Sequence, residues 1–157
     1  MIGGVSLALA VVSPVRGGAA TSPVDAALAA AVPARVPFRG LTATRVVVGQ
    51  RTLGVVIADR EGERNQGLRR RHTIGRYDGM LFVYPSTTTA IFTMSTVPVP
   101  LDIAFYDRDG RVVRRRRMDP CGGTDSTCPR YPSGGQFRFA LETLAGDLPR
   151  GRLRSPG

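Results

Sequence analysis

Leu101-Asp-Ile-Ala-Phe-Tyr-Asp-Arg-Asp-Gly-Arg-Val-Val113 is the stretch of this chain that decides its fold. Leu101, Ile103 and Phe105 alternate with other residues at the period of two that is typical of a strand with one buried face. Asp109-Gly110 predicts a tight turn, because glycine adopts the positive φ that such turns require. The stretch therefore predicts an antiparallel hairpin.

Other segments on both sides of this hairpin have the same β character. β-Branched or alternating apolar residues occur in the segments 44–48, 52–58, 79–84, 90–94 and 136–144. The polar segment 59–68 is expected to form a short helix, since its first turn would carry acidic residues that favour the helix dipole. We therefore expect a mainly β protein, a small single-domain β-sandwich or barrel-like sheet with one short helix.

Composition divides the chain into four parts. Residues 1–20 contain a short apolar run followed by small residues, which is typical of a secretory signal peptide, and a disordered Ala-rich tail is the alternative. Residues 21–40 are rich in Ala and Pro and predict a flexible spacer, because proline interrupts helices; an apolar helix at 24–32 is the alternative. The β domain is expected at residues 41–148, and a short basic tail at 149–157.

The charge of the chain is strongly basic. All 22 basic residues are arginine, against 12 acidic residues, and the formal net charge is +10. Such an excess would attract an acidic polysaccharide, another anionic component of the cell envelope, or nucleic acid. Nucleic acid is the least expected of these partners, because no aromatic residues that could stack on bases are interleaved with the arginines. A solvated surface without a specific partner is the alternative.

Four consecutive arginines, Arg114, Arg115, Arg116 and Arg117, follow the return arm of the hairpin. Side chains alternate between the faces of a strand, so two of these arginines would share the face of Ile103. A buried unpaired charge is unstable, so that face must open to solvent or to a cleft, or the arginines must meet carboxylates. We predict a ligand-binding role for the four arginines; a charged edge strand that resists edge-to-edge pairing is the alternative.

The two cysteines, Cys121 and Cys128, lie in a loop rich in Gly and Pro. In an exported protein they would form a disulfide that orders this loop. A metal site is the alternative, but two thiols without a nearby histidine fall short of the four ligands that zinc prefers. We predict a disulfide and no metal site.

Asp102 and Glu142 are the only acidic residues in the predicted core strands. Two such carboxyls could act as a general acid and base, which would make the protein a small hydrolase-type enzyme. The other explanation is structural, with each carboxyl accepting hydrogen bonds or pairing with arginine. The sequence contains no Gly-rich phosphate loop and no Ser-centred elbow, and we expect no cofactor.

Taken together, these segments resemble the uncharacterised bacterial and archaeal family called domain of unknown function 192, over about residues 44–146. The matching motifs are Ala58-Asp59, Glu63-Arg64, Gly67-Leu68, Gly79-Met-Leu-Phe82, Phe92, Met94, Pro100-Leu-Asp-Ile-Ala-Phe105, Asp109-Gly110, Met118, Pro120-Cys121, Ala140-Leu-Glu142 and Ala145-Gly146. The resemblance implies a compact, mostly β domain, often exported, without an agreed activity. It also adds Met94 and Asp102 to the candidate ligand-binding residues, because both occupy positions that the family shares.

These features together predict an exported protein, secreted or held in the cell envelope after signal-peptide cleavage, with no transmembrane segment in its mature form. The leading interpretation is a non-catalytic binding or accessory module with a basic surface for an acidic partner. The alternative is the small hydrolase-type enzyme that uses Asp102 and Glu142.

Overall fold

The computed structural model describes residues 21–157 of the chain. The signal-peptide prediction concerns residues 1–20 and lies outside the described residues. The described part is mostly β, as the sequence predicts, and it contains two short helices where one was expected, α1 (Asp25–Ala29) and α2 (Glu61–Gln66).

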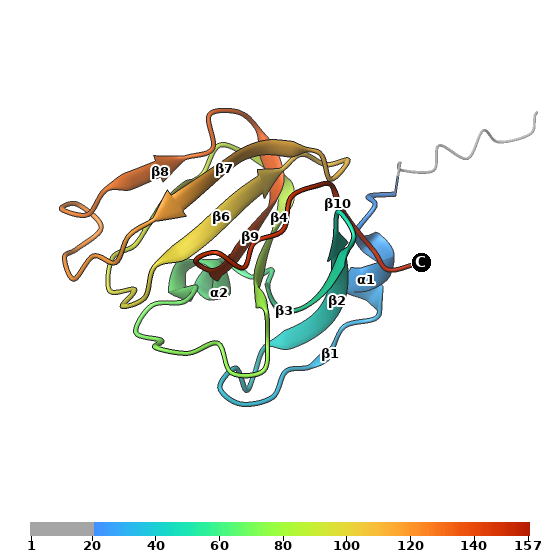
Figure 1. Cartoon of the computed structure of the whole chain (residues 1–157), viewed down its shortest axis with the longest axis horizontal. Helices are drawn as coiled ribbons and strands as arrows, with labels where there is room; N and C mark the ends of the chain where they lie inside the picture. Colours follow the sequence, from blue (N-terminus) through green and yellow to red (C-terminus); the bar gives the residue numbers. More distant parts are fainter. Residues whose placement is uncertain (1–20) are drawn as a thin grey trace, which may run out of the picture.

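The main sheet is open and has the strand order β1-β2-β3-β4-β9-β6-β7, with β10 paired to β2 (Figure 1). Its strands are β1 (Val32–Pro33), β2 (Thr42–Val48), β3 (Arg51–Ala58), β4 (Gly79–Thr88), β6 (Leu101–Tyr106), β7 (Val112–Met118), β9 (Phe137–Leu144) and β10 (Leu153–Arg154). Neighbouring strands are antiparallel except β3 and β4, which are parallel and are connected through α2. A separate ribbon pairs β5 (Ile91–Thr93) with β8 (Arg130–Pro132).

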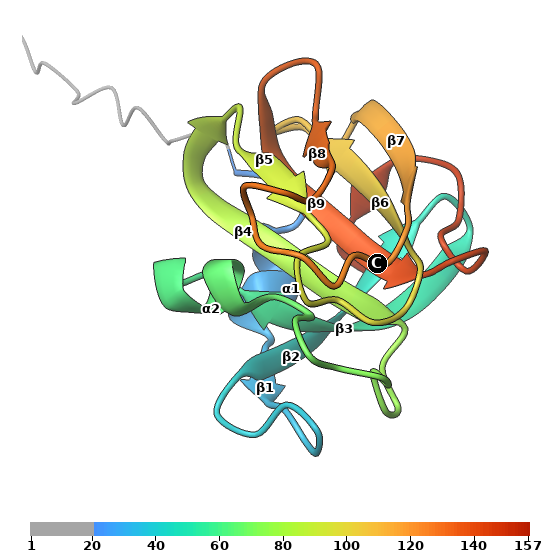
Figure 2. The ribbon, with the colours of Figure 1, turned by 90° about the vertical axis from the view of Figure 1, so that its left-hand side faces the viewer.

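The two faces of the main sheet each build an apolar core, because side chains alternate along every strand. The first face carries Phe82 and Phe105 and is covered by the β5–β8 ribbon and by the chain around α2 (Figure 2). The second face carries Tyr106 and Phe139 and is covered by α1 and the C-terminal segment. The predicted hairpin at 101–113 lies between these layers as β6 and β7.

The segments predicted as a spacer and as a basic tail are packed onto this sheet. Val24 in the first of them and Leu153 in the second are completely buried in the core of the second face. The two segments also meet each other, since the Ser155 N–H donates to the carbonyl of Pro23. Their order comes from such contacts between distant parts of the chain, which local composition does not reveal.

Strand β4 extends further than its sequence predicts. An end was expected before Pro85, but β4 continues to Thr88, which pairs with Phe137 of β9. The register shifts between Val83 and Thr88. A proline is tolerated at such an irregularity, because no regular ladder hydrogen bond is lost there. The extension carries Tyr84 along the wall of the site described below.

Candidate functional site

A cavity of about 780 Å³ lies over the first face of the sheet, between α2 and the β5–β8 ribbon. Its apolar wall comes mainly from Phe82, Tyr84, Phe92 and Leu68, and its charged groups are Glu61, Arg64, Arg69, Asp125, Arg130 and Glu142. Cavities of this size commonly hold small molecules. We therefore regard this cavity as the candidate functional site.

Glu142 lies on the central strand β9, at the floor of the cavity. Its neighbours across the sheet are Met80 on β4 and Ile103 on β6, both completely or almost completely buried. Glu142 itself is only 5% exposed, and its carboxyl forms no hydrogen bond or ion pair within residues 21–157. Burial raises the pKa of Glu142 to about 8, because the charged form loses its hydration. The carboxyl is therefore protonated at neutral pH.

Aromatic side chains surround the floor. The Phe92 ring lies edge-on to Phe82, with 5.1 Å between ring centroids, and to Phe105, with 5.5 Å. Phe105 in turn packs against Phe137 at 4.9 Å. Edge-to-face pairs of this kind add packing energy and fix ring orientation. The apolar part of the cavity is thus built from rigid, mutually supported rings.

Helix α2 forms one side of the cavity, and its start is held by Glu63. The Glu63 carboxylate accepts hydrogen bonds from the backbone N–H groups of Asp59 and Arg60, both at 3.1 Å. Such a cap satisfies N–H groups that have no partner within the helix. Arg64, the residue after Glu63, donates to the carbonyls of Asp59 and Val83. Its guanidinium lies 4.9 Å from the centroid of the Tyr84 ring. These contacts attach α2 to β4.

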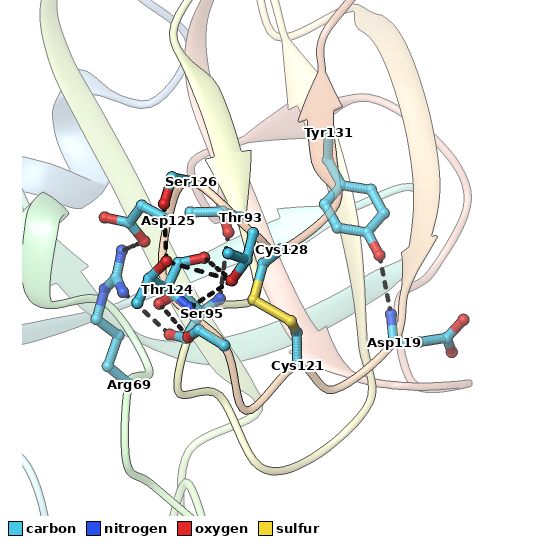
Figure 3. Close-up of a disulfide and its surroundings, with 12 residues drawn as sticks. Arg69, Thr93, Ser95, Asp119, Cys121, Thr124, Asp125, Ser126, Cys128 and Tyr131 are labelled. Atoms are coloured by element: carbon cyan, nitrogen blue, oxygen red, sulfur yellow. Dashed lines mark hydrogen bonds and ion pairs between the residues drawn. A yellow bond between two sulfur atoms is a disulfide. The ribbon is translucent and has the colours of Figure 1, made fainter.

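The loop closed by the disulfide Cys121–Cys128 (Figure 3) contributes Asp125 to the lining of the cavity. Arg69 joins this loop to the region after α2: its guanidinium donates to the backbone carbonyl of Ser95 at 3.0 Å and to Asp125 at 2.7 Å. The hydrogen bond from Arg69 holds the pKa of the Asp125 carboxyl below its usual range. The predicted disulfide is present, and it lies beside the cavity.

The four consecutive arginines of β7 lie on the edge strand of the main sheet, away from the residues that line this cavity. Arg115 donates to the backbone carbonyls of Leu148 and Pro149, and Arg116 to the carbonyl of Pro132. Arg117 lies within 3.8 Å of the Asp102 carboxylate. Most of these arginines therefore bind their own chain.

Asp102 and Glu142 are not brought together. In the register of the sheet Asp102 lies opposite Thr143, whereas Glu142 lies opposite Ile103, so the two carboxyls point to opposite faces. Asp102 accepts a hydrogen bond from the Gly146 N–H at 2.7 Å, which is a structural role. Met94 is completely buried in the core of the first face.

Sequence reasoning identified Glu142 but missed its surroundings. Arg64, Tyr84 and Arg130 come from three elements that meet only in the folded chain. The one signal available was the position of a carboxylate within the otherwise apolar segment Phe139-Ala-Leu-Glu142.

Two further searches concern the described residues only. Residues 21–157 contain no helix that combines the length and the hydropathy needed to span a membrane. In the same part of the chain no three His, Cys, Asp or Glu side chains gather as metal ligands would.

One family model and two solved structures are similar to this chain. Residues 44–155 match the model of the family DUF192, described as "Uncharacterized ACR". A crystal structure of a protein of unknown function from Novosphingobium aromaticivorans is similar, with a TM-score of 0.66 and 28% identity over 88% of this chain and 99% of that chain. A crystal structure of a protein described as a putative transcription regulator from Sinorhizobium meliloti has a TM-score of 0.59 and 27% identity, over 70% of this chain and 89% of that chain. No curated protein matches.

Proposed function

Because this chain belongs to the uncharacterised family DUF192, we propose its function from the site: it is a non-catalytic binding domain that acts outside the cytoplasm and holds a small ligand in the cavity over Glu142. The family description names no activity, and of the two solved relatives one is of unknown function and the other is described only as a putative transcription regulator. The proposal therefore depends on the chemistry of the cavity.

The observation that carries the proposal is the buried carboxyl of Glu142, which faces the cavity without a partner among the described residues. Glu142 is only 5% exposed, and removing a carboxyl from water costs free energy that an apolar side chain at this position would avoid. A ligand that hydrogen-bonds the carboxyl would offset the cost in the bound state. Binding thus gives a physical reason for a glutamate at the centre of an apolar sheet.

Two features support a location outside the cytoplasm. The Cys121–Cys128 disulfide is of the kind that persists in oxidising compartments. The signal-like composition of residues 1–20 is consistent with export. The net charge of +10 would bring anionic ligands or envelope components towards the protein.

The hydrolase alternative needs Asp102 and Glu142 to act together. The two residues lie on opposite faces of the sheet, and Asp102 is engaged with Gly146. No observation favours this function.

A small-molecule library screened against the full chain by thermal shift tests the binding function, since a compound that binds only the folded state raises the melting temperature. Ala90→Phe, at the cavity wall, should abolish the shift of each true ligand. Ala30→Phe, at the end of α1 and outside this cavity, is the matched control and should leave the shift unchanged. Shifts that survive Ala90→Phe would place binding elsewhere.

A further inference from the structure

The cavity over Glu142 differs in chemistry between its floor and its mouth. The floor combines Glu142 with the buried rings of Phe82 and Phe92. The mouth carries polar groups from α2, the disulfide loop and β8. A ligand that fits the cavity must match both ends.

The floor offers a hydrogen-bond donor in apolar surroundings. With its pKa near 8, Glu142 keeps its proton at neutral pH, and a protonated carboxyl donates one O–H. The Phe82 and Phe92 side chains are almost completely buried beside it, so this donor has apolar neighbours. The complementary ligand group is an uncharged acceptor, such as a carbonyl oxygen, at the end of an apolar body.

The mouth is positive. Three arginines, Arg64, Arg69 and Arg130, line the cavity, and Glu142 apart they face two acidic residues, Glu61 and Asp125. Arg64 and Arg69 are already hydrogen-bonded to backbone carbonyls or to Asp125. The exposed guanidinium of Arg130 forms no hydrogen bond or close ion pair within the part of the chain that the structure describes, and its charge contributes to the lowered pKa of Asp125. Arg130 is thus available to an anion.

We propose that the ligand is a small organic anion with an apolar body, whose inner end carries an acceptor for Glu142 and whose outer carboxylate pairs with Arg130. This inference rests on the binding function proposed above and names the chemical class of its ligand. A cation would also suit a carboxyl at the floor, but it would have to pass the three arginines and remove the proton from Glu142. The charge of the mouth therefore favours the anion.

Other titratable and charged groups face the same side of the sheet as Glu142. Tyr84 has its pKa raised by burial, and Asp125 has its pKa lowered by Arg69. The remaining groups that face this side of the sheet are Glu61, Arg64, Arg69 and Arg130 at the cavity and Arg114 and Arg116 on β7. The Glu142→Gln variant therefore decides whether a pH dependence of binding comes from Glu142.

The test uses three probes of the same shape with the full chain: para-acetylbenzoate, para-isopropenylbenzoate, which lacks the acceptor, and the permanent cation para-acetyl-trimethylanilinium. Binding is measured from the shifts of cavity amides in two-dimensional NMR spectra. We expect para-acetylbenzoate to bind best and to weaken roughly thirtyfold between about pH 6.5 and pH 9.5, because the protonated form of Glu142 falls tenfold per pH unit above its pKa.

Two variants sharpen the test. Glu142→Gln keeps a donor at the floor, so it should retain binding of para-acetylbenzoate and lose the pH dependence. Arg130→Gln should weaken the binding of both benzoates about tenfold, the value of one charge-assisted hydrogen bond of about 1.4 kcal/mol.

If the cation binds best and Glu142→Gln abolishes its binding, the proposed ligand class is wrong but the cavity still binds a ligand. If the benzoates bind equally well, the role of Glu142 is wrong. If no probe shifts the cavity amides, the inference fails, and the library screen then decides the binding function by itself.

Discussion

Glu142 on β9 lies opposite Ile103 on β6, so a carboxyl shares the first face of the sheet with the side chains of its larger apolar core. Met80 lies on its other side, across β4. No charged group compensates the hydration that the carboxyl loses, and burial is therefore the whole cause of its raised pKa. The stability of the protein must depend on pH through this residue.

We expect the free energy of unfolding to fall as the pH rises from about 4.5 to about 8. The pKa of Glu142 is raised from 4.5 to about 8 in the folded protein, so in this range the native state binds a proton that the unfolded state has lost. At about 1.4 kcal/mol per pKa unit, the full effect is at most about 5 kcal/mol. Urea denaturation at a series of pH values measures it. Glu142→Gln should flatten this part of the curve, and a wild-type curve equally flat would contradict the buried carboxyl.

The disulfide should stabilise the protein by restricting the unfolded chain. Replacing Cys121 and Cys128 with Ser should lower the free energy of unfolding by about 2 to 3 kcal/mol, the value expected for a short closed loop. In the wild type both thiols should resist alkylation until a reductant is added. Complete alkylation of the untreated protein would show that the bridge does not form in solution.

Arg69 should hold the disulfide loop against the rest of the cavity wall. Arg69→Gln removes its hydrogen bonds to Ser95 and Asp125, and we expect faster amide hydrogen exchange at residues 121–128. Arg130→Gln is the matched control, since Arg130 forms no such contact within the described residues and should leave the exchange rates unchanged. Equal protection in both variants would mean that Arg69 does not order the loop.

The strands of this fold could be predicted because their information is local. Alternation in 101–113 indicates both arms of the hairpin, and the β-branched segments at 44–48 and 52–58 correspond to β2 and β3. The relation between Asp102 and Glu142 could not be predicted in this way. It depends on the register between β6 and β9, where a shift of one residue would exchange the two faces.

The cavity was beyond sequence reasoning for a related reason. Its walls are α2, β5 and β8, which are short elements whose positions are set by contacts with distant parts of the chain. The packing of Val24 onto the second face of the sheet is also set by contacts with distant parts of the chain. Such contacts have no periodic pattern, and composition alone predicts a spacer.

Arg115 should contribute to stability more than the other arginines of β7. It is half-buried and donates to the carbonyls of Leu148 and Pro149, so Arg115→Gln should lower the free energy of unfolding by about 1 to 3 kcal/mol. Arg114→Gln, on the same strand but exposed, is the control and should change it by less than about 0.5 kcal/mol. Urea denaturation of both variants compares them directly, and equal losses would contradict the role of these two carbonyls.

The same contacts decide which arginines of β7 remain available to an acidic polymer. Arg115 and Arg117 are engaged with the C-terminal segment and with Asp102. Arg114 and Arg116 project from the other face at the edge of the sheet, where Arg116 donates one hydrogen bond to the Pro132 carbonyl. If β7 binds an acidic polysaccharide, the double variant Arg114→Gln with Arg116→Gln should weaken salt-sensitive binding to polygalacturonate. The double variant Arg115→Gln with Arg117→Gln removes the same charge and should weaken this binding less. Retention on immobilised polygalacturonate at several salt concentrations measures the difference. Equal weakening would indicate an effect of net charge alone, and no binding by the wild type would leave the arginines with the role of protecting an exposed edge strand.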